Sequence, residues 1–394
     1  MNPTSHSKFS RRAALIGLVP GSALTWVTTA RAAAPSVETI RTPEGGIQPQ
    51  AVVDRSGRIH LLSFSGDPKN GKLWYRTRLA NSEQWSRAVA VNADAAGAVA
   101  MGTIRGGQLA VGGDGIAHVL WFGAQAGGGH GASPLLYSRL SEDGSRFEPA
   151  RNLMRVSSVL DGGGSIAADS RGNVVAAWQA AEVAGGGEER RRLFIARSTD
   201  GGKNFSADTP AWSEPTGACA CCSTRVFADS RGRFHVLYRS AQARVNRDMF
   251  LVSAESARGE FTGGRVDPWQ IPACPMSSAA MYEGAKAIVA AWETDGQVRF
   301  GWIEGAAGRV ARITSAPGNP GGRKHPSIAV NDAGEILLAW AEGTGWNRGG
   351  VLAWQQYSPA GQPIGAPGRI ETGIPSWSLP SVVALPGGRF RIFH

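Results

Sequence analysis

Short hydrophobic runs recur along most of the chain, each followed by a polar turn and a second hydrophobic run that ends in an aromatic residue. One copy is Ala51-Val52-Val53-Asp54, with Gly57 in the turn and Leu61-Leu62-Ser63-Phe64 as the second run. Runs of this length between turn residues are typical of β-strands. The copies have their turns near positions 54, 114, 169, 229, 283, 332 and 387.

The spacing of these turns, 49 to 60 residues, leaves room for about four short strands in each unit, which is the size of a β-propeller blade. We therefore predict an all-β propeller of seven blades over residues 36–394; merging the truncated last unit would give six. The alternative all-β fold is a β-sandwich, but seven similar units in one chain disfavour it. Thr39–Thr42 resembles outer strands such as Arg312–Thr314, so we expect it to complete the final blade and close the ring.

Residues 1–32 have the features of a twin-arginine export signal. Arg11-Arg12 precedes an apolar stretch, and Ala30-Arg31-Ala32 has the small residues of a cleavage site. The alternative is an anchor helix, but Pro20-Gly21 interrupts a run that is short for the roughly 20 residues of a membrane span. We expect a periplasmic or secreted protein.

The formal charge of +10 falls to +6 when the signal removes Lys8, Arg11, Arg12 and Arg31. No basic run is interleaved with aromatic residues as in a nucleic-acid groove. The mixed cluster Glu188–Arg192 is interpreted as a solvated loop. We expect a monomer that binds neither nucleic acid nor, after signal cleavage, a membrane.

One predicted turn carries a more specific motif. Ser198-Thr199-Asp200-Gly201-Gly202-Lys203-Asn204-Phe205 resembles the Asp-box of sialidases (neuraminidases), with a looser copy at Ser141–Phe147. The resemblance implies a sialidase-like propeller, a glycoside hydrolase if it is an enzyme, with the boxes on the face away from the active site. Where sialidases have an Arg-Ile-Pro motif, this chain reads Ile40-Arg41-Thr42-Pro43.

All four cysteines fall at one point of the repeat, in Cys219-Ala220-Cys221-Cys222 and Cys274-Pro275. This pattern resembles a group of exported bacterial sialidase-like proteins. An oxidising compartment favours disulfides, which would include a bridge through Cys274. The alternatives are a thiolate site for copper(I) or zinc, helped by His325 or Met276, and redox exchange.

Loops before the first strand and after the second strand of each unit are expected on one face of the propeller. An alternative interpretation of Arg247 and Asp248 on this face is a simple exposed ion pair. The histidines at 60, 118 and 235 repeat at one position inside strands and are interpreted as structural. Loops on a rigid scaffold commonly carry function. This face collects unusual residues of blades four to six: Cys219, Cys221, Cys222, Arg225, Arg239, Arg247, Asp248, Cys274, Glu293, Asp295, His325, Glu342 and Trp346.

The leading functional hypothesis is an exported protein that binds or hydrolyses a carbohydrate or other polar ligand on this face. Hydrolysis of a glycoside needs two carboxyl groups flanking the bond. The candidates are Asp248, Glu293 and Glu342 for catalysis, with Arg225, Arg239, Arg247, His325 and Trp346 for ligand binding. The alternative is a copper- or zinc-binding propeller without glycosidase activity.

Overall fold

A computed structural model describes residues 37–94, 96–124, 133–181, 185–305 and 309–394. The predicted export signal, residues 1–32, lies outside these ranges. Within them the regular secondary structure is almost entirely β-strand, with two short 3₁₀ helices, η1 (Pro43–Gly45) and η3 (Glu188–Arg190). None of the described helices has the length and apolar character needed to span a membrane.

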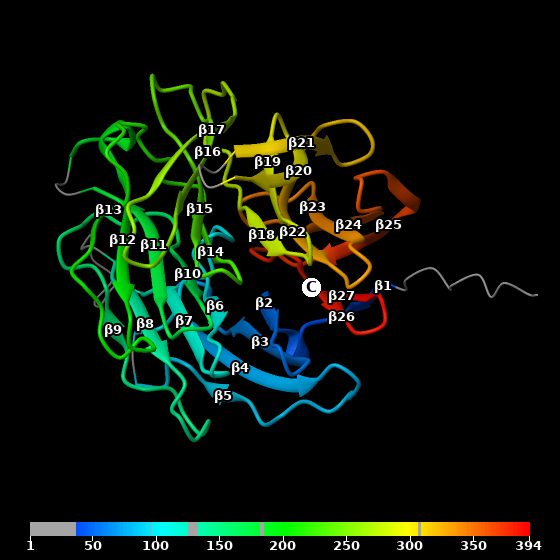
Figure 1. The fold of residues 1–394 in the computed structure, drawn as a ribbon, viewed down its shortest axis with the longest axis horizontal. Coiled ribbons are helices and arrows are strands. Elements are labelled where there is room, and N and C mark those ends of the chain that lie inside the picture. Colours follow the sequence, from blue (N-terminus) through cyan, green and yellow to red (C-terminus); the bar gives the residue numbers. More distant parts are fainter. Residues whose placement is uncertain (1–36, 95, 125–132, 182–184, 306–308) are drawn as a thin grey trace, which may run out of the picture. The chain divides into compact units, whose positions relative to one another are not determined.

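The strands form seven separate sheets. Six are antiparallel and four-stranded, each built from consecutive segments of the chain (Figure 1). The first three of these blades are β2 (Ile47–Val53), β3 (Arg58–Ser65), β4 (Lys72–Leu79), β5 (Val89–Ala90); β6 (Gln108–Val111), β7 (Ala117–Phe122), β8 (Leu135–Arg139), β9 (Arg151–Asn152); and β10 (Ser165–Ala168), β11 (Val174–Ala180), β12 (Arg192–Ser198), β13 (Thr209–Pro210).

The next three blades follow the same order. They are β14 (Arg225–Ala228), β15 (Phe234–Arg239), β16 (Met249–Ala254), β17 (Thr262–Asp267); β18 (Ala280–Glu283), β19 (Ile288–Thr294), β20 (Gln297–Glu304), β21 (Arg309–Ser315); and β22 (Arg323–Val330), β23 (Ile336–Glu342), β24 (Gly350–Tyr357), β25 (Pro363–Ile374).

The seventh blade joins the two ends of the described chain. Its strands are β26 (Ser381–Leu385), β27 (Arg389–Phe393) and β1 (Val37–Ile40), and β1 pairs with β27 in parallel, with Val37 opposite Phe390. Each first strand contacts the first strand of the next blade, and β26 contacts β2, so the ring is closed. The prediction of a seven-bladed propeller closed by an N-terminal strand is confirmed.

The turns that define the repeat are held by their own side chains. In the first blade, Asp54 accepts hydrogen bonds from the amides of Ser56 and Arg58 and lies 3.0 Å from His60 Nε2. His60 Nδ1 lies 2.6 Å from the Tyr75 hydroxyl. His118 and His235 are likewise buried and hydrogen-bonded within their blades, so all three histidines have structural partners.

The Asp-box turn shows the geometry that its sequence implies. Asp200 accepts a hydrogen bond from the Ser198 hydroxyl at 2.7 Å and from the Asn204 amide at 2.9 Å. Gly202 has a φ of 78°, a left-handed conformation that glycine adopts at little cost. Phe205 is buried against Tyr137 of the preceding blade, with ring centroids 4.8 Å apart. The box therefore fastens one blade to the next.

Neighbouring blades pack face to face through large apolar side chains. Four tryptophans near the ends of equivalent second strands are at most 1% exposed: Trp121, Trp178, Trp292 and Trp340. The inner strands surround a central channel with a volume of about 770 Å³. The loops at the ends of these strands are thus fixed around one axis.

Candidate functional site

The strand registers place the predicted site residues at one end of the blades. Arg225, which begins β14, lies opposite Leu237, and Arg239, which ends β15, lies opposite Met249. In the sixth blade, Arg323 at the start of β22 lies opposite Glu342 at the end of β23. We call this end the cysteine face.

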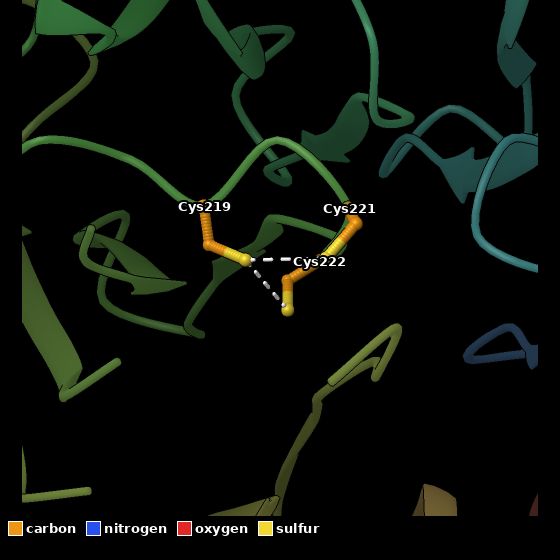
Figure 2. Close-up of side chains that lie close together, drawn as sticks. All are labelled: Cys219, Cys221 and Cys222. Carbon is orange, nitrogen blue, oxygen red and sulfur yellow. Dashed lines mark hydrogen bonds between the residues drawn. The ribbon is translucent and has the colours of Figure 1, made fainter. Parts of the chain in front are cut away.

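Three of the four cysteines form a compact cluster on this face. The Sγ atom of Cys219 lies 3.4 Å from that of Cys221 and 3.2 Å from that of Cys222, and all three sulfurs lie within 4.8 Å of one another (Figure 2). Cys219 and Cys222 are 0% and 2% exposed, and Cys221 is partly exposed. The sulfurs therefore converge in the interior, and we call these residues the three-thiol site.

Two backbone hydrogen bonds and one side-chain hydrogen bond hold the cysteine segment in place. The Cys219 amide donates to the Arg239 carbonyl at 2.9 Å, and the Ser223 amide donates to the Ser277 carbonyl at 3.0 Å. The Gln179 side chain donates to the Cys222 carbonyl. The sulfur positions are therefore imposed by the blades on both sides.

Glu188 is a further support that sequence reasoning missed. Its Oε1 accepts the Ala220 amide at 2.7 Å, and its Oε2 pairs with Arg247 at 2.6 Å. The run of mixed charges from 188 to 192 resembles a solvated surface loop, and nothing in it distinguishes Glu188. Gln179 was also missed, because its partner lies 43 residues away on the next blade.

The structure contains free cysteines and no disulfide among the described residues. The sulfur separations of 3.2 and 3.4 Å exceed the roughly 2.05 Å of an S–S bond. Cys274 is exposed and lies outside the cluster, so the disulfide interpretation, with its bridge through Cys274, is not supported here.

The three thiols of this site differ in how their surroundings affect their pKa values. Burial opposes ionisation, but hydrogen bonds from the neighbouring thiols and the charge of Arg239 hold the pKa of Cys222 well below its ordinary value. The pKa of Cys221 is raised, because its thiol is hydrogen-bonded to the other two sulfurs and is partly buried. Arg239 is 1% exposed and donates to the carbonyls of Arg247, at 2.6 Å, and Glu293. Its guanidinium is therefore a fixed cation beside the sulfurs.

Glu293 is a buried carboxyl group in the same neighbourhood. It is 2% exposed, and its Oε2 has no hydrogen-bond partner. Burial raises the pKa of Glu293 to about 7 against the opposing charge of Lys324, and the charge of Cys222 adds to the rise. Glu293 is thus the one candidate catalytic residue with the protonation properties of a general acid.

This pKa predicts a pH-dependent stability that Glu293→Gln removes. The native carboxyl binds a proton up to about pH 7 and the unfolded one only to about 4.5, so the free energy of unfolding falls as pH rises through this window. Relative to the parent, we expect the variant to gain up to about 3 kcal/mol at pH 8 and little at pH 4. Urea titrations of the reduced, metal-free protein at both pH values measure this. An equal difference at the two pH values would contradict it.

His325 lies close enough to Cys222 for a charge on that sulfur to affect the pKa of the histidine. It is 4% exposed, and its Nδ1 lies 3.2 Å from the Ser278 hydroxyl. Burial lowers the pKa of His325 to about 3, so the ring is neutral at physiological pH. The preceding residue, Lys324, donates to the Pro275 carbonyl at 2.5 Å and so links this strand to the Cys274–Ser278 loop.

The other two candidate carboxylates are occupied by structural partners. Asp248 accepts the Trp269 amide at 2.9 Å and pairs with Arg265, rather than with Arg247. Glu342 accepts the Trp340 indole and pairs with two arginines of its own blade. Among the described contacts, no side chain binds the carboxyl groups of more than one of Asp248, Glu293 and Glu342.

Arg225 and Trp346 have different partners from the thiols. Arg225 lines the central channel, where burial lowers its pKa to about 10 and its Nη1 lies 3.5 Å from Gln108 Oε1. Trp346 is 46% exposed, and its ring centroid lies 6.0 Å from Arg105 Cζ. Trp346 belongs to the sixth blade and Arg105 to the loop before the second, so loops of non-neighbouring blades meet there. The cysteine face therefore offers a buried sulfur site and an exposed aromatic side chain.

No protein-family model and no curated protein matches the sequence. Solved structures do match the fold. An α-L-arabinofuranosidase from Fusarium graminearum, in complex with an iminosugar inhibitor, has a TM-score of 0.52 at 10% identity over 86% of this chain and 97% of that chain. The intramolecular trans-sialidase from Ruminococcus gnavus, in complex with oseltamivir carboxylate, has a TM-score of 0.51 at 9% identity over 82% of this chain and 96% of that one. These likenesses show that the chain has the fold of the sialidase-like β-propellers.

Proposed function

We propose that this protein is an exported metal-binding propeller that holds a soft metal ion, copper(I) or zinc(II), at the three-thiol site. The observation that carries the proposal is the convergence of three sulfurs within 4.8 Å of one another. Thiolate sulfur is a ligand that both ions favour. Export, by the predicted twin-arginine route, is part of this proposal.

The fixed surroundings of the sulfurs support binding of an ion. Metal ligands are usually oriented by further hydrogen bonds, and here Gln179, Glu188 and two backbone carbonyls fix the loop that carries them. Glycoside hydrolysis finds less support, because it needs two available carboxyl groups. Of the three candidate carboxyl groups, all in the described part of the chain, only that of Glu293 has an oxygen without a hydrogen-bond partner.

Metal content tests this function directly. The full chain, produced in its own cells and purified anaerobically without chelators, is expected to contain close to one copper or zinc ion per molecule. A Cys219→Ser, Cys222→Ser double variant is expected to contain almost none. A metal-free parent protein with a mass two hydrogens below the reduced value would show a disulfide and defeat the proposal.

A second candidate function is binding of a carbohydrate or other polar ligand on the same face. The observation that favours it is Trp346, whose exposed ring is the kind of flat surface on which sugars stack. The matching folds of an α-L-arabinofuranosidase and a trans-sialidase give it further support. This ligand would occupy the surface around Trp346 and Arg105.

Under this second function, Trp346→Ala is expected to weaken binding of an array-identified glycan by about tenfold, a loss of about 1.4 kcal/mol. The free energy of unfolding should change by less than about 0.5 kcal/mol, because the side chain is exposed. A glycan array followed by calorimetry measures the affinity, and chromogenic glycosides separate binding from hydrolysis. No glycan bound by the parent, or equal binding by the variant, would reject this candidate.

A further inference from the structure

Among the described His, Cys, Asp and Glu residues, the three-thiol site has three ligands and no fourth. Within the described ranges, no His, Asp, Glu or other Cys places a ligand atom within 4.8 Å of all three sulfurs. Cys274 is exposed, and His325 Nδ1 is engaged by Ser278. Structural zinc sites are almost always tetrahedral with four protein ligands. The ligand number here therefore differs from that of a structural zinc site.

The sulfur triangle is close to the size that a three-coordinate ion requires. With metal–sulfur bonds of about 2.3 Å, an ion at the centre of three sulfurs needs sulfur separations of roughly 4 Å. Here two separations are 3.2 and 3.4 Å, and none exceeds 4.8 Å. All three residues lie on one loop, so adjustments of about 1 Å or less produce this geometry.

The surroundings suit a low-coordinate ion that keeps no water. Cys219 and Cys222 are buried, Cys221 is partly exposed, and none of the three cysteines lines the central channel. A zinc ion with three protein ligands ordinarily takes a water molecule as its fourth. Three thiolates around a singly charged ion leave two net negative charges. Arg239 supplies a buried positive charge next to Cys222, which offsets one of them.

We infer that the three-thiol site is a trigonal copper(I) site, in which Cys219, Cys221 and Cys222 are the complete set of ligands and Arg239 is the counter-charge. This inference rests on the proposed function, because it names the metal and its coordination. In this site Cys274, His325 and Glu293 are not ligands of the metal.

The test uses the reduced full chain under anaerobic conditions. Copper(I), supplied as its bicinchoninate complex, competes with an equal concentration of zinc(II), and X-ray absorption at the copper edge then gives the number and kind of ligands. Cys274→Ser and His325→Ala are the control variants. We expect one copper(I) ion bound by three sulfurs, at least about tenfold preference over zinc, and unchanged coordination in both controls.

The outcomes separate this inference from the proposed function. Retention of zinc in the presence of copper(I), a nitrogen or oxygen ligand in the copper spectrum, or loss of binding in Cys274→Ser would overturn the trigonal copper(I) assignment while the metal-binding function stands. Binding of neither ion by reduced, folded protein would overturn the proposed function as well.

Discussion

Cys222→Ser is expected to weaken copper(I) binding by at least about 100-fold, since even residues that only support metal ligands contribute 10- to 100-fold. Cys222 is 2% exposed, and its sulfur lies 3.2 Å from that of Cys219. Serine keeps the size of the side chain but replaces a soft sulfur by a hard oxygen, which copper(I) binds poorly. Competition with bicinchoninate measures the affinity of parent and variant.

Two further variants make this result interpretable. Cys274→Ser is the matched control, because Cys274 is exposed and outside the cluster, and its affinity should equal that of the parent. Cys221→Ser covers the case in which Cys222→Ser does not fold, because Cys221 is partly exposed. Equal copper affinity in the parent and in a folded Cys221 or Cys222 variant would contradict the assignment of these sulfurs as ligands.

Trp292→Ala is expected to lower the free energy of unfolding by about 3–5 kcal/mol. Trp292 is 0% exposed between blades, and its indole donates to Asp267 Oδ2 at 2.7 Å. The substitution leaves a cavity between the blades. It also removes one hydrogen-bond partner of the Asp267 carboxylate, and Asp267 is only 5% exposed. Urea unfolding followed by circular dichroism measures the loss.

Trp346→Ala is the matched control for Trp292→Ala, because it removes the same side chain from an exposed position. Its unfolding free energy should stay within about 0.5 kcal/mol of the parent value. If the two alanine variants were equally stable, the packing of tryptophans between blades would not be what stabilises the ring.

Much of the fold was predictable from the sequence because each blade repeats its own local chemistry. The Asp-x-Gly turns, such as Asp54 with Gly57, hold themselves through hydrogen bonds within a few residues. The degenerate fifth unit still forms its turn at Glu283–Gly284. Closure was predictable because the last unit lacks outer strands, although β1 begins two residues earlier than Thr39.

Less of the site was predictable, because its interactions join residues far apart in the sequence. The strand period places Cys219–Cys222, Glu293 and His325 on one face. It does not reveal that Arg265 and Arg369 occupy Asp248 and Glu342, or that Glu188 supports the cysteine loop across 32 residues. The spacing of the cysteines also does not show whether their sulfurs form disulfides or converge as free thiols, because this depends on the loop conformation.

Anomalous diffraction from crystals of the copper(I)-loaded protein tests the central claim most directly. Data collected above and below the copper absorption edge are expected to show one strong peak, about 2.3 Å from the Sγ atoms of Cys219, Cys221 and Cys222. A peak elsewhere in the molecule, or no peak and an S–S bond within the cluster, would contradict the account.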